Sequence, residues 1–168
     1  AAARHRRRPA HGLGDPSPRT ADGLIGAMRA ALAHTTGDAS LDGRHVVVSG
    51  VGKVGHALCE RLAKEGANLT IADLDRSAIN RAQASIAAPS AVVDPSQAHT
   101  VSCDIFAPCA LGGVLTPETI DELRCPIVVG SANNQLANDR CADLLADSGV
   151  LYLPDYVVNA GGLIQVAG

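Results

Sequence analysis

The 168-residue sequence is poor in aromatic side chains, with no Trp, one Phe and two Tyr. Proteins that bind single-stranded nucleic acid stack bases on aromatic rings, so this scarcity argues against that class. The formal net charge of −3 likewise gives no reason to expect a polyanionic partner. Because 46% of the residues are hydrophobic, and mostly aliphatic, the chain can still bury a sizeable core.

The sequence also lacks a cysteine framework and a membrane-spanning stretch. Its five cysteines form no C-x-x-C pair and are odd in number, which argues against both a disulfide scaffold and a zinc site. Buried thiols in a reducing cytosol are the expected state. No apolar run approaches the roughly 18 residues that a membrane span needs, and no signal-peptide core is present. We therefore expect a soluble, cytoplasmic protein with no metal site and no membrane partner.

The first eleven residues differ from the remainder because they carry four arginines and no acid. An Arg-rich opening is compatible with a transit peptide or a basic arm. No apolar face accompanies the arginines, so we interpret residues 1–11 as a disordered basic segment. The chain begins with Ala rather than Met, which suggests a fragment or a processed end. Residues 12–168 are expected to form one domain.

From residue 44 onward, short β-branched runs alternate with amphipathic helical patterns. Strands are expected at 45–49, 68–72, 91–93, 103–107, 126–130 and 150–153. Helices are expected at about 19–34, at 54–65 and 77–86, after Thr116, at 138–148 and from about Asn159. Strands separated by helices imply right-handed crossovers and a parallel sheet. The predicted fold class is α/β, a Rossmann-type doubly wound parallel sheet with helices on both faces.

A glycine-rich loop links the first strand to the next helix and consists of Gly50, Val51, Gly52, Lys53, Val54 and Gly55. G-x-G-x-x-G is a weak signal alone, but the strand before it and the helix after it are the context of dinucleotide binding. Gly50 is expected to make the tight turn and Gly52 to let the pyrophosphate approach the backbone. Gly55 is expected to allow close packing of helix on strand. Lys53 either touches a phosphate or points to solvent.

The second strand ends at Asp73, 21 residues after Gly52. A carboxylate there accepts hydrogen bonds from the adenosine ribose 2′-hydroxyl and repels a 2′-phosphate, which favours NAD as the cofactor over NADP. The nearby Arg76 could instead support a 2′-phosphate.

Longer motifs follow the three later strands: residues 107–113 (APCALGG), 130–136 (GSANNQL) and 154–162 (PDYVVNAGG). Together with the glycine loop and Asp73, they resemble the family of amino-acid dehydrogenases that oxidise glutamate, leucine, phenylalanine or valine. The resemblance extends over residues 12–168 and is strongest to the leucine and valine dehydrogenases. It implies NAD-dependent oxidative deamination of a branched-chain L-amino acid to a 2-oxo acid and ammonia, by a homo-oligomer.

The resemblance also implies roles for individual residues. The glycine loop would hold the pyrophosphate and Asp73 the adenosine ribose. Thr20 matches a position near the nicotinamide carboxamide, and Asn134 one that binds around the nicotinamide ribose. From the residues alone, Asn134 could equally serve a turn and Cys109 could be a core thiol. The remaining matches are Ala107, Cys109 and Ala110 against the nicotinamide, and Leu163 and Val166 in the substrate side-chain pocket.

No catalytic residue can be assigned. In the family resembled here, two lysines and an aspartate of an N-terminal substrate domain perform catalysis. The only lysines of this sequence are Lys53 and Lys64, and neither lies in a matching motif. We therefore interpret the chain as the cofactor-binding part of such an enzyme, inactive alone. The alternative is a standalone dinucleotide-binding module without catalysis.

Overall fold

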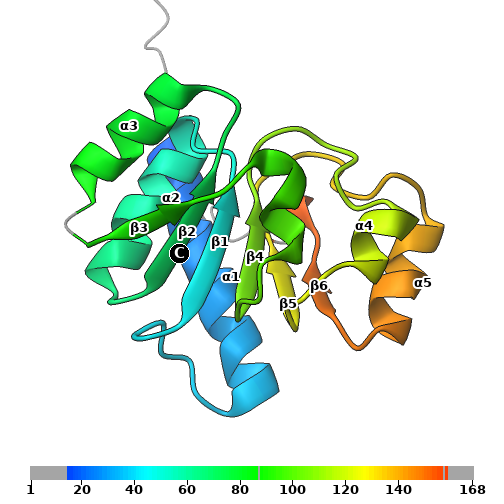
Figure 1. Cartoon of the computed structure of the whole chain (residues 1–168). Helices are drawn as coiled ribbons and strands as arrows, with labels where there is room; N and C mark the ends of the chain where they lie inside the picture. The colour runs from blue at the N-terminus through cyan, green and yellow to red at the C-terminus, as the bar shows by residue number, and fades with distance from the viewer. Residues whose placement is uncertain (1–14, 87, 157, 159–168) are drawn as a thin grey trace, which may run out of the picture.

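The computed structural model describes residues 15–86, 88–156 and 158. Its centre is a six-stranded sheet in which every neighbouring pair is parallel, with the order β3-β2-β1-β4-β5-β6 (Figure 1). This arrangement confirms the predicted fold class. The strands are β1 (His45–Ser49), β2 (Asn68–Ala72), β3 (Ser90–Val92), β4 (Ile105–Pro108), β5 (Ile127–Val129) and β6 (Leu151–Leu153).

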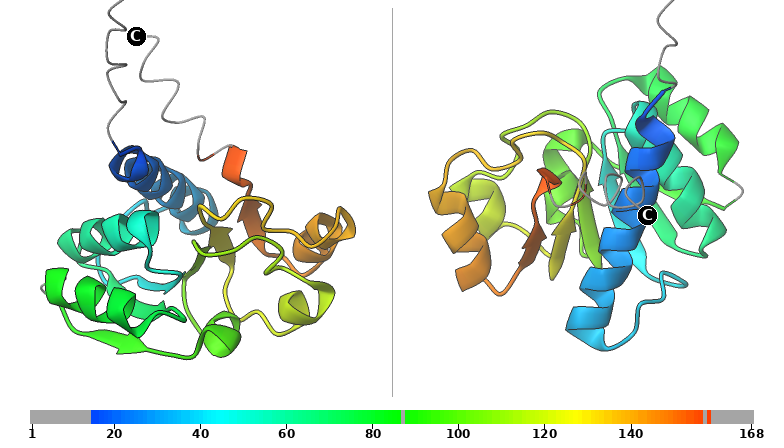
Figure 2. Two further views of the ribbon diagram at one scale, coloured as in Figure 1. Left: turned by 90° about the horizontal axis from the view of Figure 1, so that it is seen from above. Right: turned by 180° about the vertical axis from the view of Figure 1, so that it is seen from behind.

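Helices cover both faces of the sheet. One core cluster contains side chains of α1, α2 and α3, and the other contains side chains of η1, α4 and α5. Seen from behind, α1 crosses in front of the strands (Figure 2). The helices are α1 (Ser17–Thr36), α2 (Lys53–Lys64), α3 (Arg76–Ser85), the 3₁₀ helix η1 (Pro95–Thr100), α4 (Pro117–Asp121) and α5 (Arg140–Asp147). None of the helices within the described ranges is long and apolar enough to cross a membrane.

The central strand β1 shows why the sheet is buried on both faces. Val46, Val47 and Val48 are all fully buried. Successive side chains of a strand point to opposite faces, so Val46 and Val48 join one core cluster and Val47 joins the other. Three consecutive β-branched residues therefore suit a parallel strand that lies between two layers of helices.

Most of the element boundaries differ from the sequence expectations by one or two residues. The fourth strand begins at Ile105 rather than at residue 103, and Asp104 just before it accepts a hydrogen bond from the His45 backbone N–H at 2.8 Å. The helix η1 was not expected; Asp94 caps it by accepting from Ser96 N. α1 is one turn longer overall than predicted. Residues 1–11 and the helix expected from Asn159 lie outside the described residues.

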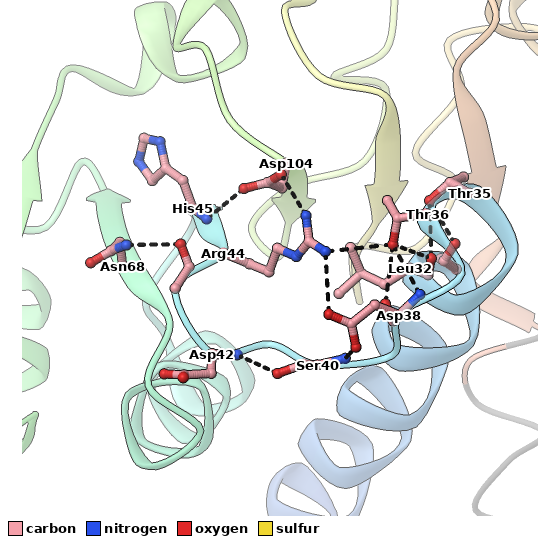
Figure 3. A network of polar contacts seen from close by, with 12 residues as sticks. Leu32, Thr35, Thr36, Asp38, Ser40, Asp42, Arg44, His45, Asn68 and Asp104 are labelled. Atoms are coloured by element: carbon pink, nitrogen blue, oxygen red, sulfur yellow. Dashed lines mark hydrogen bonds and ion pairs between the residues drawn. The ribbon is translucent and has the colours of Figure 1, made fainter.

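The amino end of the sheet is closed by polar contacts around Arg44 (Figure 3). Its guanidinium lies 3.6 Å from the Asp38 carboxylate and 3.5 Å from that of Asp104. The network joins the segment after α1 to the starts of β1 and β4. The loops at the carboxyl ends of the strands, where parallel sheets bind ligands, form the opposite edge.

Candidate dinucleotide-binding site

The glycine loop after β1 begins with a turn that only glycine fits. Gly50 has φ +101°, and its N–H donates to the Ala72 carbonyl at 2.7 Å. A Cβ atom at this position would lie 2.5 Å from the backbone nitrogen of Ala110. Both the positive φ and the close approach of the loop after β4 exclude a larger residue.

The two other glycines of the loop lie in opposite environments. A Cβ atom on Gly55 would come within 1.9 Å of the Gly50 carbonyl oxygen, so its absence lets α2 begin directly against the turn. Gly52 is exposed, and a Cβ atom there would meet nothing within 4 Å. Gly52 also precedes α2 without any side-chain cap. The exposed Gly52 thus leaves room for a pyrophosphate near the amino end of α2, where the first N–H groups of a helix lack partners within the helix.

Asp73 is half-buried at the end of β2 and is fixed by two backbone groups. One carboxylate oxygen accepts from Val51 N at 2.7 Å, and the other accepts from Asp75 N at 2.8 Å. An ionised carboxylate has about four acceptor positions, so each oxygen can accept a further hydrogen bond. The structure therefore holds the predicted ribose-binding carboxylate against the predicted phosphate-binding loop.

A shallow pocket of about 370 Å³ adjoins Asp73. It lies between the β2–α3 connection and the residues that follow β3. The pocket contains two carboxylates, one guanidinium and several apolar side chains. Its lining residues are Asp73, Leu74, Arg76, Ile79, Val92, Val93, Asp94 and Pro95. The sequence alone does not predict this pocket, because its lining residues come from two separate segments, 73–79 and 92–95.

Cys109 and Ala110 lie next to the glycine loop, since a Cβ atom on Gly55 would lie 3.5 Å from the Cβ of Cys109 and one on Gly50 would lie 2.6 Å from the Cβ of Ala110. Ala107 is buried in β4 opposite Val48. Cys109 N donates to the Ser49 carbonyl at 2.7 Å, and Ala110 is exposed. Burial raises the pKa of the Cys109 thiol, with an opposing contribution from Ser131. The raised pKa favours the uncharged thiol at neutral pH, which is a weaker nucleophile than a thiolate.

The loop after β5 contains Asn134, which is exposed and has φ +50°. Its carbonyl accepts from Gly113 N at 2.7 Å, so the loops after β4 and β5 are joined. The next residue, Gln135, was not singled out from the sequence. Its side chain is fully buried and donates to the Gly130 carbonyl at 2.8 Å, while its Oε1 has no partner among the described residues.

The first turn of α1 lies beside the glycine loop. A pocket of about 430 Å³ is lined by Ser17 and Pro18 on one side and by Gly52 and Lys53 on the other. Thr20 lies in the same turn, and its hydroxyl donates to the Pro16 carbonyl at 3.3 Å. Lys53 is largely exposed, with Nζ 3.8 Å from Asp15. Leu163 and Val166 lie outside the described residues.

No group of three or more His, Cys, Asp or Glu side chains in the described part of the chain could hold a metal ion. Two of the histidines have side-chain partners away from the glycine loop. His99 lies 2.8 Å from Glu122, and His45 lies 2.9 Å from the Thr70 hydroxyl. Neither contact involves a residue of the glycine loop.

Comparison with known proteins gives a consistent picture. The model of the glutamate/leucine/phenylalanine/valine dehydrogenase family matches residues 70–167. The leucine dehydrogenase of Thermoactinomyces intermedius is 48% identical over 154 residues, which cover 92% of this chain and 42% of that protein. The valine dehydrogenase of Streptomyces virginiae is 48% identical over 157 residues, covering 93% and 44%. The chain thus spans less than half the length of these relatives.

Solved structures show the same likeness. The L-tryptophan dehydrogenase of Nostoc punctiforme superposes with a TM-score of 0.82 at 41% identity, and the match covers 92% of this chain and 47% of that one. A hetero-hexameric glutamate dehydrogenase of Thermus thermophilus shares the fold, with a TM-score of 0.66 at 24% identity.

Proposed function

Because the chain belongs to the glutamate/leucine/phenylalanine/valine dehydrogenase family, we propose that residues 12–168 are the NAD-binding part of an amino-acid dehydrogenase. The substrate class we propose is branched-chain L-amino acids such as leucine or valine, which are deaminated to 2-oxo acids and ammonia. The observation that carries the cofactor assignment is Asp73, held by Val51 N beside the glycine loop. A fixed carboxylate there accepts a ribose hydroxyl and repels a 2′-phosphate.

The proposed contacts divide the cofactor into three parts. The first N–H groups of α2, with Gly52 exposed before them, would bind the pyrophosphate. Asp73 would bind the adenosine ribose. Bound NAD would supply the nicotinamide ring that accepts hydride from the substrate Cα. The neutral thiol of Cys109, with Ala107 and Ala110, would exclude water from that ring, while Asn134 would bind its ribose and Thr20 its carboxamide.

The chemistry of deamination also requires a base and a cation for the substrate carboxylate. Lys53 is exposed beside Asp15, and Lys64 is exposed at the end of α2. Neither placement suits these roles, so we propose that this chain alone does not catalyse the reaction. An assay with L-leucine or L-valine and NAD should give no turnover, and turnover at a normal enzymatic rate would contradict the proposal. We further propose that the full-length enzyme is a cytoplasmic homo-oligomer acting on a small-molecule substrate.

The cofactor assignment is tested by titrating the chain with NADH and with NADPH while the nicotinamide fluorescence is recorded. The sequence contains no Trp, so little protein emission overlaps with the signal. We expect fluorescence to rise with NADH and to respond less to NADPH. Equal responses would refute the argument from Asp73 and would favour a phosphate contact by Arg76. No response to either would refute dinucleotide binding.

A further inference from the structure

The pocket beside Asp73 contains a second carboxylate at the same edge of the sheet. Ile71 of β2 pairs with Val92 of β3, and Val93 N donates to the Ile71 carbonyl at 3.1 Å. The parallel register therefore continues to the end of both strands. Asp73 lies two residues after Ile71, and Asp94 lies two residues after Val92. Both line the pocket of about 370 Å³.

The remaining walls of this pocket are mainly apolar. Leu74 is 88% exposed, which is unusual for a leucine in a well-packed domain, and Val92 is also exposed. Ile79 and Pro95 add further aliphatic surface. If a ribose is held by Asp73, the base attached to that ribose lies in this neighbouring pocket. Aliphatic lining residues suit the faces of a flat heterocycle, which leaves the polar lining residues to contact its edge.

The carboxylate of Asp94 is fixed in position and keeps one oxygen available. Its Oδ1 accepts from both Ser96 N at 2.8 Å and Ser96 Oγ at 2.5 Å. Within the described ranges, no residue donates to Oδ2. The hydrogen bonds from Ser96 hold the pKa of Asp94 below its usual value. Asp94 is therefore ionised at neutral pH and can act toward a ligand only as a hydrogen-bond acceptor.

We propose that Asp94 determines which purine the pocket accepts, by taking a hydrogen bond from the 6-amino group of adenine. This inference rests on the proposed dinucleotide binding and adds its base specificity. Adenine presents an N–H₂ donor at position 6, whereas hypoxanthine presents a carbonyl oxygen there. The carboxylate attracts the first and repels the second. Arg76, the pocket's cationic lining residue, is a donor and would have the opposite preference.

The test compares NADH with reduced nicotinamide hypoxanthine dinucleotide, whose base has a carbonyl oxygen in place of the 6-amino group and a proton on the neighbouring N1. Dissociation constants come from nicotinamide fluorescence, so turnover is not needed. We expect the unmodified chain to bind NADH about tenfold or more tightly than the hypoxanthine analogue, as is typical of one charge-assisted hydrogen bond. Equal affinities would overturn the inference while leaving the proposed function intact.

The variant Asp94→Asn gives the sharper result. The Asn oxygen can still accept from Ser96 N, which places the amide N–H₂ where Asp94 Oδ2 was. We expect the preference to reverse toward hypoxanthine, a change that a merely structural role of Asp94 would not produce. Asp94→Ser, which keeps a capping hydroxyl and removes the charge, should bring the affinity ratio close to one. Cooperative thermal unfolding confirms that each variant is folded.

The matched control is Asp75→Asn. Asp75 caps α3 as Asp94 caps η1, with Oδ1 accepting from Ser77 N at 2.8 Å and from Ser77 Oγ at 2.7 Å, but it is not among the residues that line the pocket. The substitution keeps the Asp75 backbone N–H that donates to Asp73, so this variant should keep the affinity ratio of the unmodified chain. An unchanged ratio in folded Asp94→Asn, or the same reversal in Asp75→Asn, would overturn the inference. If the unmodified chain binds neither dinucleotide, the proposed function fails, and this inference fails with it.

Discussion

The carboxylate of Asp73 accepts a hydrogen bond from the backbone N–H of Val51 at 2.7 Å, across 22 positions of the chain. The contact joins the end of β2 to the middle of the glycine loop. One residue thus orients the loop and presents an acceptor beside it. Because the second oxygen is held by Asp75 N, the carboxylate has a defined orientation before any ligand arrives, and this preorganisation favours tight binding.

Replacing Asp73 with Ala should weaken NADH binding by about tenfold or more, since a hydrogen bond to a charged group contributes about 1.5–3 kcal/mol. The NADH/NADPH preference should narrow at the same time, because the repulsion of a 2′-phosphate is lost. Fluorescence titration measures both affinities. Asp147→Ala, at the end of α5 and far along the chain from the loop, is the control and should bind as the unmodified chain does. An unaltered preference in Asp73→Ala would contradict the role of the carboxylate.

Two helical glycines should respond in opposite ways to substitution by Ala. In Gly55→Ala the new methyl group would overlap the Gly50 carbonyl oxygen, and overpacking of this kind costs about 1–3 kcal/mol or more. In Gly26→Ala the methyl group would meet nothing within 4 Å in the middle of α1, so the better helix propensity should stabilise the chain by up to about 1 kcal/mol. Urea unfolding midpoints measure both. Similar effects of the two changes would show that the loop accommodates a side chain.

The sequence predicts best what depends on local pattern. β1 and β2 have the bounds expected from their apolar runs, because a strand buried on both faces leaves a continuous signal. The glycine loop is predictable because its motif lies within six consecutive residues. The role of Gln135 is not predictable from the sequence, since its burial depends on a contact with Gly130 inside a folded loop. The pocket formed with Asp94 is not predictable either, because it requires the register of β2 against β3, which pairs residues that are distant in sequence.

Stability should decline in alkali between about pH 9 and pH 12. Burial raises the pKa of Cys59 from 9.0 to about 12, with smaller contributions from Cys109 and Glu60. Above pH 9 the unfolded chain loses this proton while the folded chain keeps it, so the free energy of unfolding falls as the pH rises. Denaturant midpoints measured from pH 8 to pH 11 should show the decline. In Cys59→Ala the denaturant midpoint should fall less steeply with pH from pH 9 upward.

Tyr152 provides the comparison for that experiment. Burial raises its pKa from 10.0 to about 12, with added repulsion from Asp155. Ionisation of Tyr152 also lowers the free energy of unfolding as the pH rises, but its contribution begins near pH 10, whereas that of Cys59 begins near pH 9. Tyr152→Phe should therefore leave the slope between pH 9 and pH 10 unchanged and reduce it only above pH 10. If both variants altered the same pH range, the decline would arise from other groups.

Asp104 should contribute more to stability than its ion-pair partner Arg44. Its Oδ2 accepts from His45 N at 2.8 Å at the start of β1, and its Oδ1 lies 3.5 Å from the Arg44 guanidinium (Figure 3). Asp104→Ala removes the acceptor of a half-buried N–H, which costs about 1–3 kcal/mol. Arg44→Ala breaks partly exposed ion pairs, whose contribution is about 0–1 kcal/mol.

Asp104→Asn separates these two contributions, because its amide oxygen can still accept from His45 N while the charge is lost. We expect urea unfolding to give Asp104→Asn a stability close to that of Arg44→Ala. Asp104→Ala should be clearly less stable than either. The salt dependence gives an independent readout, since screening weakens the ion pair and not the hydrogen bond. Raising the ionic strength should therefore reduce the effect of Arg44→Ala and leave most of the effect of Asp104→Ala. The opposite order would mean that the charge network, rather than the strand N–H, holds this edge of the sheet.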